Sequence, residues 1–199
     1  NLADPQYEIP KGGNKHSLFA GALWIGGVDA GGQLKVAAMT YRQYANGGGD
    51  DFWPGPLTLA NATISADECI QWDRHFKINR SEVEEYHTRF GTDPTYVIPE
   101  SILDWPAHPF DNSAPGQDQF LAPFYDVNGN DLYEPYAGDY PDYNVTGNND
   151  AAALFGDQTL FWIFNDKGNI HGESNADPLG LEIHAQAFGF AADNEVNDM

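Results

Sequence analysis

The chain has 199 residues, the length of one large domain or two small ones. It carries 30 Asp and Glu residues against 9 Lys and Arg residues, so its formal net charge at pH 7 is −21. Nucleic acids and anionic membranes are bound mainly through Lys and Arg, and this charge therefore excludes both classes of partner. No apolar run reaches the ~18 residues of a membrane-spanning helix, so we expect no membrane insertion.

The composition predicts a globular, mainly β protein. Hydrophobic residues make up 41% of the chain and aromatic residues 14%, enough for a sizeable core, and the 21 Gly and 13 Pro residues predict many turns. We expect sandwich-like antiparallel sheets with short helical insertions. Residues 1–199 are interpreted as a single domain and as a fragment of a longer chain, because the first residue, Asn1, is not Met. Cys69 is the only cysteine, which excludes an intramolecular disulfide.

The N-terminal part predicts a β-hairpin. Residues 18–28 are apolar at both odd and even positions, which is typical of a strand covered on both faces. A Gly-rich turn follows at residues 29–32, and residues 33–44 alternate between apolar and polar side chains. The next loop, residues 46–51, lacks the Lys and the Ser or Thr of a phosphate-binding loop, so it is not a nucleotide site.

Residues 65–90 predict a helical insertion made of two short helices. Ser65 with Glu68, and Ser81 with Glu84, have the spacing of capping boxes. The second helix is expected to end at Gly91. The residues expected to face the core are Ile70, Trp72 and Phe76 in the first helix and Val83, Tyr86 and Phe90 in the second.

Residues 99–157 predict a long irregular loop, preceded by a short strand at residues 96–98 and containing one helical turn at residues 101–105. Such a length with so little regular structure is unusual in a compact domain. Its many aromatic residues argue against disorder, because aromatic side chains bury large areas. We therefore expect a bound cation to organise this loop.

The centre of the loop, APFYDVNGNDLYEPYAGDYP at residues 122–141, carries oxygen-bearing side chains two residues apart. Their spacing is that of the first ligands in a helix-loop-helix calcium loop, and position seven of that pattern supplies a backbone carbonyl. Position twelve is Ala137, which cannot bind a metal, and the nearest strong carboxylate follows two residues later. We predict a structural Ca²⁺ site formed by Asp126, Asn128, Asn130, Leu132 and Asp139.

Several features set this loop apart from a calcium sensor. Asp131 replaces the usual Gly at position six, where Asp tolerates a left-handed backbone, and Glu134 is a candidate for a contact through water. Pro123 and Pro135 argue against flanking helices. Magnesium suits the loop less well, because calcium has the more flexible coordination. The alternative interpretation is a solvated turn, since Asn, Asp and Gly form turns without any metal.

The last third predicts two strands, at residues 159–165 and 179–192, with a polar connection between them. Gly168 is expected to be left-handed in the turn that follows the first strand. The second strand alternates apolar and polar residues, as a half-exposed strand does. Zinc binding by His171, Glu182 and His184 stays an alternative, although no motif such as HExxH supports it.

Five phrases of the sequence together resemble one group of secreted proteins. The phrases are YEIPKGG from Tyr7, ALWIGGVDAGGQL from Ala22, DFWPGPL from Asp51, LAPFYDVNGNDLYEPYAGDYP from Leu121 and FWIFNDKGNIH from Phe161. The chain is similar to the N-terminal regions of large Bacteroidota surface proteins that the type IX secretion system exports. The resemblance implies export to the cell surface or the medium and a longer parent chain, and it supplies no catalytic residues. In the usual loop pattern, Asp-x-Asn-Gly-Asp-Gly, Asn130 and Asp131 replace the last two residues, which is expected to weaken the cation site.

These observations predict an extracellular structural or adhesive module of a secreted surface or filament protein, stabilised by calcium and without enzymatic activity. Its expected partners are other domains of the same parent chain or identical copies. The alternative is a carbohydrate-binding or glycan-degrading module, in which Trp53, Trp105 or Tyr133 would stack on surface glycans. The acidic residues are too numerous for any one pair to identify a glycosidase.

Overall fold

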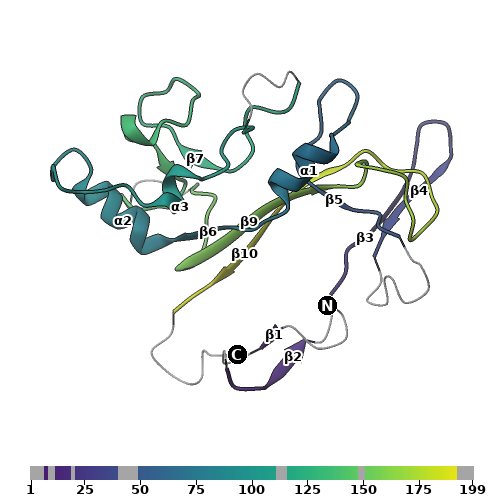
Figure 1. Cartoon of the computed structure of the whole chain (residues 1–199), viewed down its shortest axis with the longest axis horizontal. Coiled ribbons are helices and arrows are strands. Elements are labelled where there is room, and N and C mark those ends of the chain that lie inside the picture. Colours follow the sequence, from purple (N-terminus) through teal and green to yellow (C-terminus); the bar gives the residue numbers. More distant parts are fainter. Residues whose placement is uncertain are drawn as a thin grey trace.

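The computed structural model describes residues 7–8, 12–18, 21–39, 49–110, 116–147 and 151–191. Within them the fold is mainly β, as the sequence predicts: antiparallel sheets carry a few short helices, which is consistent with a sandwich-like fold (Figure 1). The strands are β1 (Tyr7–Glu8), β2 (His16–Leu18), β3 (Trp24–Val28), β4 (Leu34–Ala38), β5 (Trp53–Pro54), β6 (Phe76–Asn79), β7 (Phe124–Tyr125), β8 (Tyr140–Pro141), β9 (Gln158–Asn165) and β10 (Glu182–Gly189). The helices are α1 (Ala66–Trp72), α2 (Arg80–Arg89), α3 (Glu100–Leu103) and the 3₁₀ turn η1 (Pro135–Ala137).

Strand β9 is the centre of the largest sheet, because both of its edges are paired. β10 pairs with it along its full length. On the other edge, β6 pairs with residues 158–161 of β9 and β5 pairs with residues 164–165. The predicted strand at residues 159–165 is therefore confirmed. Burial alternates along β9: Thr159, Phe161, Ile163 and Asn165 are buried, whereas Leu160, Trp162 and Phe164 are half-buried.

The hydrophobic core lies on the side of this sheet that the helices cover (Figure 1). It joins the buried row of β9 to side chains from β6 and the helices. Each large apolar side chain that is fully buried contributes about 1.5–3 kcal/mol to folding. The main members are Phe76 and Ile78 of β6, Val83 and Tyr86 of α2, Ile102 of α3, Trp105, and Phe161 and Ile163 of β9.

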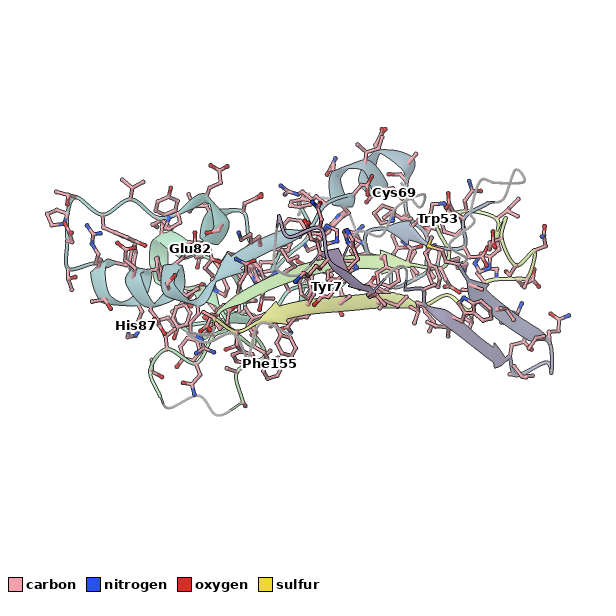
Figure 2. All side chains as sticks on the ribbon, turned by 90° about the horizontal axis from the view of Figure 1, so that it is seen from below. Tyr7, Trp53, Cys69, Glu82, His87 and Phe155 are labelled. Atoms are coloured by element: carbon pink, nitrogen blue, oxygen red, sulfur yellow. The ribbon has the colours of Figure 1, made fainter. Side chains whose placement is uncertain are left out.

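On β10 the polar row of side chains faces the helix side of the sheet and the apolar row faces away from it. Glu182 and Gln186 pair with buried residues of β9, and the Gln186 Oε1 accepts the backbone N–H of Phe155 (3.1 Å). Ile183 and Ala185 pair with half-buried residues of β9, and these side chains lie on the opposite face of the sheet. Figure 2 shows the molecule from below, on the side away from the helices. The sheet therefore presents apolar side chains on both faces.

Strands β3 and β4 form the predicted hairpin, which projects from one end of the main sheet (Figure 1). Asp29 closes its turn, because its Oδ1 accepts the backbone N–H groups of Gly31 (2.8 Å) and Gln33 (2.9 Å). The prediction of one strand over residues 18–28, covered on both faces, is wrong. β2 ends at Leu18, β3 begins at Trp24, and Trp24 is 70% exposed because the hairpin extends away from the core. Residues 40–44 lie outside the described residues.

Helix α1 begins with the predicted capping box. The Ser65 Oγ accepts the backbone N–H of Glu68 (3.2 Å), and the Glu68 carboxylate accepts the N–H of Ser65 (2.8 Å). Trp72 is buried as expected, but Ile70 is 74% exposed, so its predicted place in the core is wrong. Ile70 lies two residues before the buried Trp72, about 200° around the helix axis, so burial of Trp72 points Ile70 into solvent. Phe76 reaches the core from β6.

The second helix begins two residues earlier than predicted. Glu82 accepts the backbone N–H of Asn79 (2.9 Å), so the cap at Ser81 with Glu84 is wrong: pairing of β6 with β9 holds Asn79 extended until the helix starts. Further along, α3 confirms the helical turn expected at residues 101–105. Residues 96–98 form no strand, which corrects that prediction, and Val97 is 81% exposed.

Gly168, in the turn after β9, is required by a close approach and not by its backbone angle. It does not lie in the left-handed region, so that prediction is wrong. A Cβ atom added at Gly168 would instead lie 2.6 Å from the Trp53 Cβ and 2.7 Å from its Cγ. Because Trp53 belongs to β5, this contact sets how closely the turn packs on the neighbouring strand.

We expect Gly168→Ala to lower the free energy of unfolding by about 1–3 kcal/mol, because the new methyl group overpacks against Trp53. Gly189→Ala is the matched control, since a Cβ there meets no atom within 4 Å. Its effect should stay within about 0.5 kcal/mol. Urea unfolding of both variants measures the difference, and equal stabilities would contradict the close approach.

Candidate functional site

The two ends of the predicted calcium loop are held together by a short sheet. β7 pairs with β8, and the rings of Tyr125 and Tyr140 stack with centroids 5.1 Å apart. Asp126 directly follows β7 and Asp139 directly precedes β8, so this pairing places both residues at the base of one loop. The backbone N–H of Val127 donates to the Asp139 Oδ1 (2.9 Å), which joins the two ends directly.

Asp126 organises the first half of the loop through the backbone. Its Oδ1 accepts the N–H groups of Asn128 (3.2 Å) and Gly129 (2.7 Å), and its Oδ2 accepts the N–H of Asp131 (2.7 Å). Asp131 has a φ of +62°, the left-handed backbone expected at this position. A hollow of about 350 Å³ adjoins the loop, and both Asp126 and Asp131 line it. Asp131 is thus a further oxygen donor beside the predicted set.

Asp139 organises the second half of the loop and is completely buried. Its Oδ2 accepts the backbone N–H of Glu134 (2.8 Å). At the exposed tip, the Asn130 Oδ1 accepts the N–H of Leu132 (3.0 Å), and its Nδ2 donates to the Glu134 carboxylate (2.7 Å). The structure therefore places Asp126 and Asp139 next to the paired strands at the base of the loop, while Asn128, Asn130 and Leu132 lie in the exposed part.

The oxygen atoms of this loop are chemically suited to calcium. Within the described residues, no three Asp, Glu, His or Cys side chains are grouped closely enough to hold a metal ion. A site here would combine carboxylates with amide and backbone carbonyl oxygens, which is the donor mixture that calcium accepts. The Asp126 Oδ1 already accepts two N–H groups, whereas its Oδ2 accepts only one, so Oδ2 keeps a lone pair with which it could bind a metal ion.

The three residues considered for zinc do not form one site. The His184 Nε2 lies 2.6 Å from the Glu182 Oε1, and the other Glu182 oxygen accepts the N–H of Leu57 (2.6 Å). His171 is buried elsewhere, with the carbonyl oxygens of Val36 and Asp166 against its two ring nitrogens. Both nitrogens are therefore engaged, which leaves neither free for a metal.

A buried polar cluster that the sequence analysis missed lies between the hairpin and the main sheet. Asp51 and Asp166 are fully buried, and the amides they accept come from residues distant in the chain. The Asp51 carboxylate accepts the N–H groups of Ala38 (3.0 Å) and Glu173 (3.0 Å). The position of Asp166 directly after the most apolar strand could have indicated a buried carboxylate. Nothing in the sequence around Asp51 indicates one, because its partners are remote in the chain. Asp166 accepts the N–H groups of Leu179, Gly180 and Leu181.

This cluster does not have the geometry of a catalytic triad. In a triad, the two ring nitrogens of the histidine contact the serine and the aspartate separately. Here the Ser174 Oγ (3.5 Å) and the Asp51 carboxylate (3.7 Å) both lie on the Nδ1 side of His171. The Nε2 faces a backbone carbonyl inside the protein, so the cluster is structural.

No helix in the described ranges is long and apolar enough to cross a membrane. Comparisons with protein-family models, with curated proteins and with solved structures give no match.

Burial raises the pKa of the Asp51 carboxyl, but hydrogen bonds from Ser174, Ala38 and Glu173 outweigh burial and hold that pKa below its usual range. The stability that Asp51 contributes is therefore present above the ordinary carboxyl pKa of about 3.9 and is lost as the pH falls below it. We expect Asp51→Asn to cost about 1–3 kcal/mol at pH 7, since buried amides lose a charged acceptor.

The difference between wild type and Asp51→Asn should narrow as the pH falls toward about 3. Urea unfolding at pH 7, 5 and 3 measures it. Asp67→Asn, an exposed change on α1, is the control and should stay within about 0.5 kcal/mol of wild type. A difference that does not change with pH would show that the charge of Asp51 is unimportant.

Proposed function

We propose that this chain is an extracellular structural or adhesive module of a secreted surface or filament protein, and that bound calcium stabilises it. The observation that carries the proposal is the apolar face of the main sheet that points away from the helices. Trp162 and Phe164 of β9 lie on this face beside Ile183 and Ala185 of β10. A sheet face of this kind is normally covered by another layer of protein.

The hairpin supports the same conclusion. Trp24 is 70% exposed, Val28 67% and Leu34 68%, and all three belong to the β3–β4 hairpin or its ends. Contiguous exposed apolar surface on a protein marks a site of contact with another protein. The proposed partners are accordingly a neighbouring domain of the same parent chain or an identical copy.

Calcium enters the proposal through the loop at residues 122–141. Asp126 and Asp139 flank the paired strands β7 and β8 at its base, and Asp131 lines the hollow beside Asp126. A net charge of −21 favours uptake of a divalent cation. The proposed location outside the cell rests on the resemblance to exported Bacteroidota proteins. A calcium-binding loop suits that location.

We expect removal of calcium by a chelator to lower the melting temperature by roughly 5–10 °C. A ligand at 100 times its Kd stabilises by about 2.7 kcal/mol, and 1 kcal/mol corresponds to roughly 2–4 °C in a domain of this size. Differential scanning calorimetry with calcium and with chelator measures the shift.

Two variants distinguish the loss of calcium binding from a general loss of stability. Asp126→Asn should abolish the response to calcium, whereas Asp51→Asn should be less stable yet keep it, because Asp51 lies outside this loop. A melting temperature that chelation leaves unchanged would refute the calcium site. The structural role would stand, since the apolar sheet face does not depend on the metal.

A second candidate, a carbohydrate-binding module, is favoured by one pocket. It has a volume of about 440 Å³ and lies beside the stretch of β9 between its pairings with β5 and β6. The rings of Phe52 and Phe164 pack edge to face with their centroids 5.5 Å apart, and those of His75 and Trp162 do so at 5.1 Å. Aromatic walls with a few polar groups are typical of small-ligand sites. Of the three aromatic residues considered for sugar stacking, Trp53 lines this pocket.

The other two anchor the core side of the molecule. Trp105 is buried, and its Nε1 donates to the carbonyl of Pro123 (3.0 Å). Tyr133 is half-buried, and its hydroxyl donates to the carbonyl of Ile102 (2.6 Å). Both rings line a smaller hollow of about 180 Å³, so the larger pocket beside Trp53 is the better candidate for a glycan.

We expect a glycan array to show no binding and a hydrolase screen to show no turnover, because a structural module recognises protein surfaces. Turnover of any polysaccharide would contradict the proposal. Binding that is lost in a folded Trp162→Ala variant but kept in Tyr136→Ala would assign the chain to the second candidate. Tyr136 is the control because it is 78% exposed on the calcium loop and lines no part of the pocket.

A further inference from the structure

The ring of His171 is completely buried between two carbonyl groups. Its Nδ1 lies 2.8 Å from the carbonyl oxygen of Val36, and its Nε2 lies 2.5 Å from that of Asp166. A carbonyl oxygen accepts hydrogen bonds and cannot donate them. A neutral imidazole has a single N–H, so it would leave one ring nitrogen with its lone pair against a carbonyl lone pair. The doubly protonated ring supplies both donors.

A negative charge stands beside this ring. The Asp51 Oδ2 lies 3.7 Å from the His171 Nδ1, and both side chains are fully buried. A buried charge is costly unless an opposite charge or several hydrogen bonds compensate it. The Asp51 carboxylate has backbone donors from Ala38, Glu173 and Ser174, and His171 supplies the positive charge next to it.

The remaining charged groups around the ring have other partners. Lys35 on β4 pairs with Asp177 (3.0 Å), and the Asp166 carboxylate accepts the amides of residues 179–181. The Lys167 Nζ donates to the carbonyl of Asn61. Asp50 and Glu173 flank the cluster in sequence and add negative charge to its surroundings. The electrostatic environment therefore favours a cation at His171.

We propose that His171 is held in its doubly protonated form and that, with Asp51, it latches the β3–β4 hairpin to the main sheet. The geometry joins three parts of the chain: Val36 and Ala38 on the hairpin, Asp166 at the end of β9, and Ser174 on the following loop. The Ser174 Oγ also donates to the Val36 carbonyl (3.3 Å), and the ring of Trp53, labelled in Figure 2, lies 5.8 Å from the imidazole.

The latch makes attachment of the hairpin dependent on pH. The folded protein binds a proton that an exposed imidazole releases near neutral pH, so the free energy of closing the latch becomes less favourable as the pH rises. Loss of that proton removes the hydrogen bond of one ring nitrogen to its carbonyl group and leaves Asp51 without its counter-charge. The main sheet does not depend on this proton, because β9 keeps its pairings with β6 and β10.

The protonation state is tested on the unmodified protein by ¹⁵N NMR of the histidine side chains at pH 7.5. We expect two slowly exchanging ring N–H groups for His171. His87 on α2, labelled in Figure 2, is exposed and serves as the reference, because its ring N–H groups should exchange rapidly with water. A neutral tautomer with one N–H at His171 would overturn the proposal.

The latch is tested by amide hydrogen exchange at pH 6.5 and 8.5, corrected for the intrinsic dependence of exchange on pH. We expect protection at residues 24–38 to fall roughly tenfold at the higher pH, while residues 158–165 keep theirs. His171→Gln should leave the hairpin poorly protected at both pH values. His87→Gln should behave as wild type.

Lys35→Gln separates the latch from other attachments of the hairpin. This change removes the ion pair with Asp177 but leaves His171 and Asp51 in place. It should loosen the hairpin at both pH values and preserve the pH effect. Hairpin protection that does not depend on pH in the wild type would overturn the latch even if His171→Gln failed to fold.

Discussion

Three aspartates have completely buried carboxylates: Asp51, Asp139 and Asp166. These carboxylates accept loop N–H groups that make no hydrogen bond within a helix or a sheet. A buried N–H without a partner costs about 1–3 kcal/mol, so an irregular segment can be buried only if something accepts its amides. One carboxylate satisfies two or three of them through charge-assisted hydrogen bonds. Each of these side chains thus fixes a stretch of chain that has little regular structure of its own.

This chemistry explains why the sequence located the important loop but could not say how it is organised. Asp126, Asn128 and Asn130 lie two residues apart, a spacing that suits a calcium ion. The same stretch suits side chains that accept amides two to five residues ahead, as Asp126 and Asn130 do. Both roles use the same oxygen lone pairs. The structure supplies the second role directly, so the proposed calcium ion would add stability to a loop that hydrogen bonds already shape.

Local signals were predictive where local interactions decide the structure. The capping box at Ser65 and the apolar run of β9 both appear as expected. The sequence could not reveal that β6 replaces part of the helical insertion, because that strand exists only through its pairing with β9. The same holds for Asp51 and His171, because each has a partner more than a hundred residues away in the chain, Glu173 and Val36 respectively. It also holds for Gly168, which is explained by Trp53.

The polarity of β10 links the fold to the proposed role. Its polar row is satisfied by loops on the helix side, so its apolar row is left for the opposite face, beside Trp162 and Phe164. A surface of this kind needs a partner, yet a net charge of −21 makes identical copies repel one another. In the proposed parent chain, a neighbouring domain would meet this face at a high effective concentration, and tethering would overcome the repulsion. The physical balance therefore favours a partner within the parent chain over self-association at low ionic strength.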